Sequence, residues 1–488
     1  MNFSWPVVGA QVFVIFATWI LGSWLLSPLR RIPGPGLASF SRLWHIIHII
    51  KGDQNVVLDD LHERYGPFVR VAPNEVSVSH PDAIKKILMG PLHKSSFYKA
   101  MALPDYRYQT PMSLTDPILK NERSRHLASG WKLANILQNE EAVDDTVRLF
   151  TSRLDGYAES GEAFDLGMYF SFLAFDVVGE VLFSKQFGFL QEDRDVGHSI
   201  RNGPYLSVAL SVAGYVRWLL VAFFGNPIVT WLGVLPMGHI FNTVVRALDA
   251  RVKNPDSRYD VLAHWFRAVE KSPDRVTIRN IYAATTSAVS AGSDTVGCAL
   301  QAFIYYMLRH PNAWQRVRDE VDEAVREQGM CQDPVVSFAD AQRLPFLQAC
   351  IKEALRVFAP VPMGLPRDVG EGGLDIGGEH FAKGTILSIN PWVMHHNKEI
   401  WGPDALEFNP DRWLTDDAAN LDNYFMPWSY GYNSCPGQHM ARMEMSKILA
   451  TLVRDYSFRQ QDPTQEWKWE AYFTIVPHSW PCHVERRS

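Results

Sequence analysis

A ten-residue loop near the C-terminal end, Trp-Ser-Tyr-Gly-Tyr-Asn-Ser-Cys-Pro-Gly at 428–437, constrains the fold more than any other stretch. Gly431 lies four residues before Cys435, and Gly437 lies two residues after it. Glycine permits positive φ angles and close backbone approach, and Pro436 fixes one φ angle. The loop can therefore hold the cysteine sulfur in place with backbone N–H groups directed at it. Such groups stabilise a thiolate, which is the form of cysteine that binds metals.

The residues around this loop limit which metal site Cys435 can make. Residues 438–445 read as the start of a helix, whose positive N-terminal end further favours an anionic sulfur. A lone cysteine among glycines is more commonly a small buried hydrophobic residue. Zinc would need further ligands, and the sequence has no C-x-x-C pair or cysteine–histidine cluster nearby. A single thiolate suits haem, because the porphyrin supplies the four equatorial ligands.

The loop resembles the haem-binding signature F-x-x-G-x-R-x-C-x-G of the cytochromes P450, the haem-thiolate monooxygenases. Gly431, Cys435 and Gly437 match that signature, and Trp428 conservatively replaces its Phe. Asn433 stands where the signature has Arg, which is a real departure. The resemblance implies that Cys435 is the axial ligand of the haem iron. It also implies that Trp428, Gly431 and Gly437 shape the haem-binding loop, and that residue 433 faces a haem propionate.

A long helical pattern over Thr277–Arg309 contains Ala-Gly-Ser-Asp-Thr at 291–295. Gly292 and Thr295 are three residues apart and share a face, so the missing side chain leaves a groove beside the hydroxyl. This resembles the family's A/G-G-x-D/E-T motif, which implies that the groove holds dioxygen, that Thr295 hydrogen-bonds it and that Asp294 relays protons. The alternative is a threonine bonded to its own helix and an aspartate at a surface. The position of the motif, 140 residues before Cys435, favours the family role.

Two further motifs predict a buried ionic scaffold. Glu353 and Arg356 are three residues apart within an apolar helical stretch, 344–360. Such pairs are usually exposed and contribute little. Here they resemble the family's E-x-x-R, and Phe-Asn-Pro-Asp-Arg-Trp at 408–413 resembles F-x-P-x-R-W. The resemblance implies that Arg412 joins Glu353 and Arg356 in a structural triad that holds the cysteine loop, with close geometry offsetting the desolvation of the charges.

Two arginines outside the loop are candidate partners of the haem propionates. Arg125 lies in a basic stretch, Asn121–Leu137, that reads as a helix, where a solvated charged face is the commoner outcome. The resemblance implies instead that Arg125 reaches a propionate. Arg367 follows Pro366 and fits the family's strand arginine that contacts a propionate. Since Asn433 carries no charge, Arg125 and Arg367 are expected to carry more of the propionate charge.

The N-terminal stretch predicts a membrane anchor. Val7–Leu26 is a run of twenty residues without a charge, long enough to span a bilayer. Arg30 and Arg31 follow it, which predicts an N-terminus outside the cytosol. A cleaved signal peptide is the alternative, disfavoured because no basic residue precedes the run and the run is long. We therefore expect a signal anchor at 1–29, a Pro/Gly hinge at 30–36 and one haem-thiolate monooxygenase domain at 37–488.

The composition limits which partners and which cellular compartment are expected. The formal net charge of −6 does not suggest nucleic acid as a partner. Five cysteines are an odd and sparse set, which favours a reducing compartment without disulfides.

Tyr205–Pro236 has one charged residue and is broken by Gly-Asn-Pro, which favours apolar helices dipping into a membrane surface. Phe68–Ala72 and Glu75–Ser79 read as a small hairpin.

Together these features predict a mainly α fold with a small β region, the cytochrome P450 fold, with a single catalytic domain behind the anchor. The resemblance, which extends to fungal biosynthetic members, implies insertion of one oxygen atom of O2 into a lipophilic small molecule during natural-product (secondary metabolite) biosynthesis. The reaction would be hydroxylation, epoxidation or multi-step oxidation. The resemblance also implies that the cofactor is haem b. Electrons would come from NADPH through a separate cytochrome P450 reductase, with cytochrome b5 as a further candidate. The protein would cross the endoplasmic reticulum membrane once and have a cytosolic catalytic domain.

Two other functions stay open at this point. One is an oxygen-independent isomerase or dehydratase of the P450 type, and the other is a non-catalytic haem-binding membrane protein. Loss of the threonine would favour the isomerase, and Thr295 is present. An intact motif at 291–295 also argues against a scaffold, because a scaffold needs no proton relay.

Overall fold

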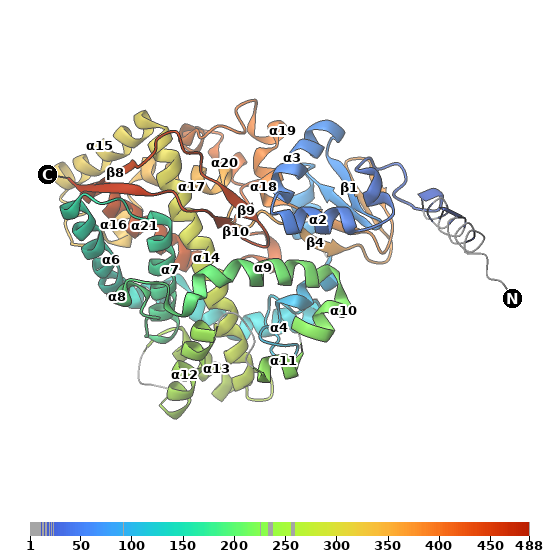
Figure 1. Cartoon of the computed structure of the whole chain (residues 1–488), viewed down its shortest axis with the longest axis horizontal. Coiled ribbons are helices and arrows are strands. Elements are labelled where there is room, and N and C mark those ends of the chain that lie inside the picture. The colour runs from blue at the N-terminus through green and yellow to red at the C-terminus, as the bar shows by residue number, and fades with distance from the viewer. Residues whose placement is uncertain are drawn as a thin grey trace, which may run out of the picture.

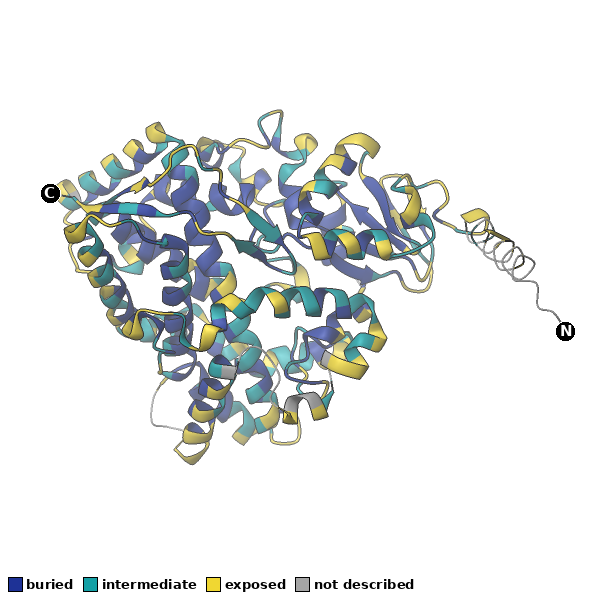
Figure 2. Ribbon diagram, in the orientation of Figure 1, coloured by how far each residue is buried: buried dark blue, intermediate teal, exposed yellow. Residues whose placement is uncertain are grey.

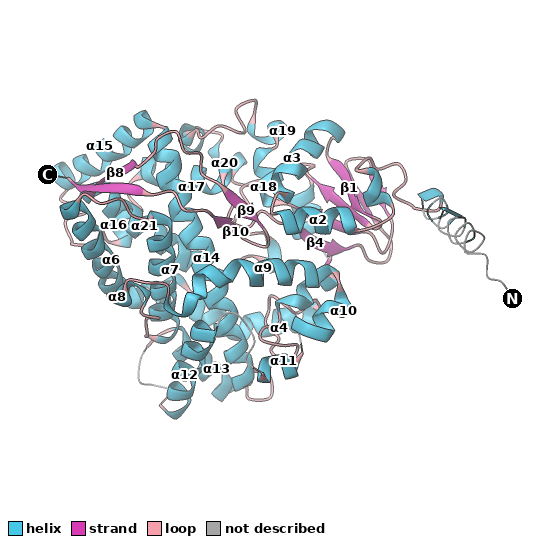
Figure 3. Ribbon diagram, viewed as in Figure 1, coloured by secondary structure: helices cyan, strands magenta, loops and turns pink. Residues whose placement is uncertain are grey.

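The computed structural model describes residues 24–90, 92–224, 226–232, 238–254 and 259–487, together with Gln11, Val14, Ala17, Thr18, Ile20 and Gly22. The predicted anchor at 1–29 falls largely outside the described residues. Figure 3 shows that helices make up most of the body and that strands form small separate groups. The prediction of a mainly helical fold with a small β region is confirmed.

The longer helices form the bulk of the molecule (Figure 1). They are α2 (Leu43–Lys51), α3 (Gln54–Tyr65), α4 (Pro117–Leu127), α6 (Glu140–Ser160), α7 (Leu166–Phe183), α9 (Ser199–Tyr215), α12 (Gly238–Lys253), α13 (Val261–Lys271), α14 (Ile278–Arg309), α15 (Pro311–Gln328), α17 (Pro345–Val357) and α21 (Gln438–Asp455). Shorter helices connect them: α5 (Leu133–Ile136), α8 (Phe189–Glu192), α10 (Arg217–Leu219), α11 (Pro227–Trp231), α16 (Phe338–Ala341), α18 (Pro391–His396), α19 (Lys398–Trp401) and α20 (Ala418–Leu421). The 3-10 turn η3 (Ser96–Met101) and the π turn η7 (Leu220–Phe224) bear on the site.

The largest sheet has five strands in the order β1 (Phe68–Ala72), β2 (Glu75–Val78), β7 (Ile386–Ile389), β4 (Leu365–Asp368) and β3 (His93–Lys94). β1 and β2 form an antiparallel hairpin, as the sequence predicts. β2 runs parallel to β7, and β4 runs antiparallel to both β7 and β3. In the β3–β4 pair, Lys94 lies opposite Arg367. The sheet therefore brings two basic side chains from distant parts of the sequence together.

Three two-stranded sheets complete the β region. They pair β5 (Leu374–Ile376) with β6 (Glu379–Phe381), β8 (Tyr456–Gln460) with β11 (Cys482–Arg486), and β9 (Trp469–Ala471) with β10 (Ile475–Pro477). All three pairs are antiparallel.

The core is built around α14, which packs along α7 and also contacts α17 and α21. Figure 2 shows that the interior of the body is largely buried and that exposed residues lie at its periphery. Thr277 and Asn280 form a capping box at the start of α14, so the helix begins where the sequence predicts. Among the described residues, α7 is the helix long and apolar enough to cross a membrane, with a mean hydropathy of 1.6, but 83% of it is buried within the protein. That burial is expected of a core helix.

The helix predicted over Asn121–Leu137 is shorter in the structure, where α4 ends at Leu127. The indole Nε1 of Trp265 on α13 donates to the carbonyl of Leu127 at 2.9 Å and satisfies this helix end. A Cβ at Gly130 would lie 2.9 Å from both Trp265 Nε1 and Val261 Cγ1, so the chain turns where α13 approaches closely. The break comes from tertiary packing, which the local sequence does not show.

Candidate functional site

The loop at 428–437 closes on itself through backbone hydrogen bonds. The Cys435 N–H donates to the Trp428 carbonyl at 2.8 Å, and the Ser434 N–H donates to the Gly431 carbonyl at 3.1 Å. Gly431 has a φ of +67°, and a Cβ there would lie 2.6 Å from the Leu88 carbonyl oxygen. Both the conformation and the space therefore require glycine at position 431.

The Cys435 sulfur lies at the start of α21, where the backbone N–H groups of Gly437 and Gln438 hydrogen-bond to it. Burial raises the pKa of the Cys435 thiol, and these two N–H groups act in the opposite direction. Gly437 has an ordinary φ of −80°, and a Cβ there would lie 3.9 Å from Sγ. Of the two glycines, only Gly431 has the positive φ angle expected from the sequence.

The motif at 291–295 lies in the middle of α14. Thr295 Oγ1 donates to the Ala291 carbonyl at 2.8 Å, which is the bond that a threonine makes to its own helix. Burial raises the pKa of the Asp294 carboxyl to about 7, although the side chain is accessible. A Cβ at Gly292 would lie 3.1 Å from Val178 Cγ2, so this glycine also allows α7 to approach α14.

The predicted triad is fully assembled. Arg356 donates to the Glu353 carboxylate through Nε at 2.9 Å and Nη2 at 2.8 Å, and Arg412 Nε donates to it at 3.0 Å. The indole Nε1 of Trp413 adds a further bond at 2.9 Å. All three charged side chains are buried.

His395 connects this triad to the cysteine loop, and sequence reasoning missed it. Its carbonyl accepts from Arg356 Nη1 at 2.7 Å, and its ring Nε2 accepts from the Met426 N–H at 2.9 Å. The ring stacks on Phe425 at a centroid distance of 5.7 Å. Burial, and then the charge of Arg356, lower the pKa of His395, so the ring is a neutral acceptor. The two neighbouring histidines at 395–396 were the only signal in the sequence.

Three buried cations gather near the loop. Arg367 Nη1 donates to Tyr98 Oη at 2.9 Å and to the Pro366 carbonyl at 3.0 Å, while its Nε has no partner in the described part of the chain. Lys94 Nζ donates to the carbonyls of residues 111 and 112 at 2.8 and 2.9 Å. Lys120 Nζ donates to the Tyr432 carbonyl. Arg125, the other arginine predicted to meet a propionate, is exposed at the last turn of α4, where its role stays a prediction.

These residues fit a haem. Cys435 supplies one sulfur held by backbone N–H groups, which suits an iron whose other in-plane ligands come from a porphyrin. Both polar atoms of the Asn433 side-chain amide are buried and, like Arg367 Nε, have no hydrogen-bond partner among the residues that the structure describes. Buried polar groups in proteins normally have a hydrogen-bond partner. The carboxylates of a haem would provide acceptors for these unpaired donors and a negative charge beside the buried cations.

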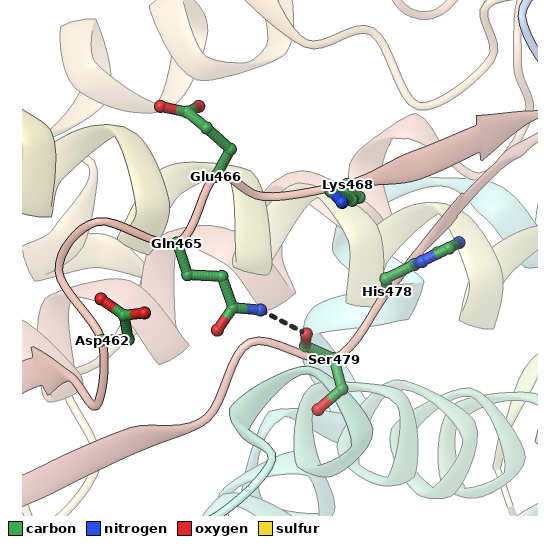
Figure 4. Close-up of a pocket in the computed structure, with 6 residues that line it drawn as sticks. All are labelled: Asp462, Gln465, Glu466, Lys468, His478 and Ser479. Carbon is green, nitrogen blue, oxygen red and sulfur yellow. Dashed lines mark hydrogen bonds between the residues drawn. The ribbon is translucent and has the colours of Figure 1, made fainter.

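The surface hollow in Figure 4, about 460 Å³, is a separate feature. It is lined by Asp462, Gln465, Glu466, Lys468, His478 and Ser479, and Gln465 Nε2 donates to the Ser479 carbonyl at 3.3 Å. None of the candidate site residues lines it.

Comparison with known proteins gives a consistent result. Residues 33–479 match the Cytochrome P450 family. The chain is 31% identical to cytochrome P450 monooxygenase gsfF of Penicillium aethiopicum over 477 residues, covering 95% of this chain and 94% of that protein. It is 31% identical to cytochrome P450 monooxygenase hepC of Aspergillus oryzae, covering 93% of each. It is 29% identical to a pisatin demethylase of Fusarium vanettenii, covering 94% of this chain and 89% of that protein. The family match along almost the whole chain and the relatives above 30% identity show that this chain belongs to the cytochrome P450 family.

Proposed function

We propose that this P450 is a haem-thiolate monooxygenase that inserts one atom of dioxygen into a lipophilic small molecule in natural-product biosynthesis. The observation that carries the proposal is the Cys435 sulfur, which is hydrogen-bonded by two backbone N–H groups at a helix start. Haem bound through this thiolate would supply the oxygen-activating chemistry, since a thiolate ligand favours O–O cleavage.

The residues of α14 provide the proton chemistry that such a reaction needs. With a pKa of about 7, the Asp294 carboxyl can both release and accept a proton near neutral pH. Thr295 Oγ1 donates to a carbonyl of its own helix, and its lone pairs remain available to accept. We propose that the Thr295 hydroxyl would rotate to donate a hydrogen bond toward the haem side of α14, and that the Asp294 carboxyl would supply the proton.

The lipophilic substrate class is supported by an apolar cluster that joins segments far apart in the sequence. Phe97, Tyr98 and Met101 of η3 pack with Leu210 of α9 and with Met363. Because aromatic and methionine side chains provide adaptable apolar contact, this cluster suits a hydrophobic substrate.

P450 monooxygenases take electrons from a redox partner. We propose NADPH-cytochrome P450 reductase in this role, with cytochrome b5 as a second donor, and an endoplasmic reticulum anchor at 1–29 that leaves the catalytic domain in the cytosol. A group of exposed apolar side chains on α10, η7 and α11 supports contact with a membrane surface. These are Trp218, Val221, Phe223, Ile228 and Trp231.

The test is consumption of NADPH and oxygen by membranes that contain the protein and a reductase, with products analysed for a panel of lipophilic precursors. A monooxygenase consumes both and forms a product one oxygen heavier. Turnover of an oxidised substrate without oxygen would identify an isomerase or dehydratase. Haem binding without turnover of any precursor, and without reduction by the reductase, would favour a non-catalytic haem protein. The Cys435→Ser variant is the matched control.

A further inference from the structure

We propose that Lys94 and Lys120, together with Arg367, bind the haem carboxylates in this protein and supply the charge that the family's arginine would supply at position 433. The inference rests on the proposed haem-binding function and deepens it by naming cation positions that the sequence motifs do not include.

The first argument is burial without compensation. Lys94, Lys120 and Arg367 are only 5%, 7% and 2% exposed. Among the described residues, they donate to carbonyl oxygens and to one tyrosine hydroxyl, and no ion pair joins any of them to a carboxylate. Buried charges are normally paired, because removing an ion from water is costly. Three buried cations in one place therefore indicate a site built for an anionic group.

The second argument is mutual repulsion. Burial, and then the charge of Arg367, lower the pKa of Lys120 to about 8. Burial, Arg367 and Lys120 lower the pKa of Lys94 in the same way. The register of β3 and β4 fixes the backbone of Lys94 opposite that of Arg367. The two residues therefore stay neighbours as long as the strands are paired. An anion with more than one charge would relieve this repulsion, and a haem has two carboxylates.

The third argument is the position of the lysines relative to residue 433. Lys120 Nζ donates to the carbonyl of Tyr432 and lies 5.1 Å from the centre of its ring. The hydroxyl of Tyr432 donates to the Leu92 carbonyl at 2.7 Å, two residues before Lys94. Tyr432, which directly precedes Asn433, therefore connects both lysine segments to the cysteine loop. The charge missing at position 433 is replaced from α4 and β3, while the Asn433 amide retains neutral hydrogen-bonding capacity.

The experiment measures the rate of haem transfer from the intact protein to an apo-globin acceptor. Lys120→Met removes the charge while keeping an unbranched chain, and we expect it to release haem roughly tenfold faster, the effect of about one charged hydrogen bond. Lys132→Met, at an exposed lysine beyond the end of the same helix, is the matched control and should leave the rate unchanged. Lys120→Arg should retain haem as the wild type does. Asn433→Arg should restore retention in the Lys120→Met background, because both residues would act on one ligand group.

A second measurement separates propionate binding from an effect on folding. Haem dimethyl ester lacks the carboxylate charges, so wild type and Lys120→Met should release it at equal rates. A persisting difference with the ester, or equal rates for Lys120→Met and Lys132→Met with haem, would overturn the inference. The red-shifted Soret band of the reduced carbon monoxide complex reports separately on the proposed function. Wild type that shows this band while Lys120→Met leaves haem release unchanged would refute the lysine assignment alone.

Discussion

The Glu353 carboxylate is the point at which a small change should have the largest structural effect. Its Oε1 accepts from Arg356 Nη2, Arg412 Nε and the Asn409 N–H, at 2.8, 3.0 and 2.9 Å. Its Oε2 accepts from Arg356 Nε and Trp413 Nε1, both at 2.9 Å. In Glu353→Gln, an NH2 group replaces one oxygen. Either orientation of the amide then places a donor against at least two other donors. It leaves the buried Arg356 without its charge partner and Arg412 with Asp404 alone.

Removing one partner of a buried ion pair destabilises a protein by about 3–5 kcal/mol. We expect Glu353→Gln to reach at least that range, because the buried Arg356 loses its charge partner and two or three of the five donors lose their acceptor. The matched control is Glu371→Gln, which breaks an exposed contact with Lys383. Exposed pairs of this kind contribute about 0–1 kcal/mol. The loss in the free energy of unfolding is therefore expected to be several times larger for Glu353→Gln than for Glu371→Gln.

The assay is denaturant unfolding of the holoprotein, followed by circular dichroism for the helices and by the Soret band for the haem. Because Arg356 is bonded to His395 and His395 to Met426, loss of the triad should also loosen the cysteine loop. The Soret signal of Glu353→Gln should therefore be lost at a lower denaturant concentration than the helical signal. Equal midpoints for Glu353→Gln and Glu371→Gln would refute the reasoning.

Three further predictions follow from the site. Cys435→Ser should abolish the red-shifted Soret band of the reduced carbon monoxide complex, and a retained band would exclude Cys435 as the ligand. Thr295→Ala should keep haem and substrate binding but lower the product formed per NADPH several-fold and release more hydrogen peroxide, whereas an unchanged ratio would make Thr295 an ordinary helix residue. Deleting residues 1–29 should release much of the protein from membranes and leave a bound fraction, measured by sedimentation. Complete solubility would mean that the exposed side chains of Arg217–Trp231 do not bind membranes.

Features carried by local spacing could be predicted from the sequence. The cysteine loop, the long helix over 277–309 and the motifs around Glu353 and Arg412 each depend on residue type within a few positions. Their elements appear in the structure close to the expected bounds. The three triad residues also lie in contact, although two of them come from one helix and the third from a distant turn.

The basic residues near the loop could not be found in this way, because their proximity is created by tertiary structure. Lys94 meets Arg367 only through the pairing of β3 with β4, which are separated by more than 250 positions. Lys120 is buried on α4, whereas Arg125 is five residues away and reaches solvent. Five residues correspond to a rotation of about 140° on a helix, so the two cannot share a face. A basic helix in the sequence shows how many cations are present but not which one is buried.

The last prediction concerns Glu444, a buried carboxyl on α21 whose Oε1 has no partner among the described residues. Burial raises the pKa of Glu444 to about 8, from an ordinary value of 4.5. The native state then keeps a proton that the unfolded state has released above about pH 4.5. Because the native state binds more protons, this residue makes the free energy of unfolding fall as pH rises from about 4.5 to about 8.

Glu444→Gln keeps the size and removes the titration, so its stability relative to wild type should increase steadily over that range. Apparent melting temperatures of holoprotein at pH 5, 6, 7, 8 and 9 test this, with the exposed Glu371→Gln as the control. The difference between Glu444→Gln and wild type should grow up to about pH 8 and then level off, while that of the control stays flat in the same range. A difference for Glu444→Gln that does not change with pH would mean that the carboxyl is ionised in the native protein, and that an acceptor or cation beyond the described contacts stabilises it.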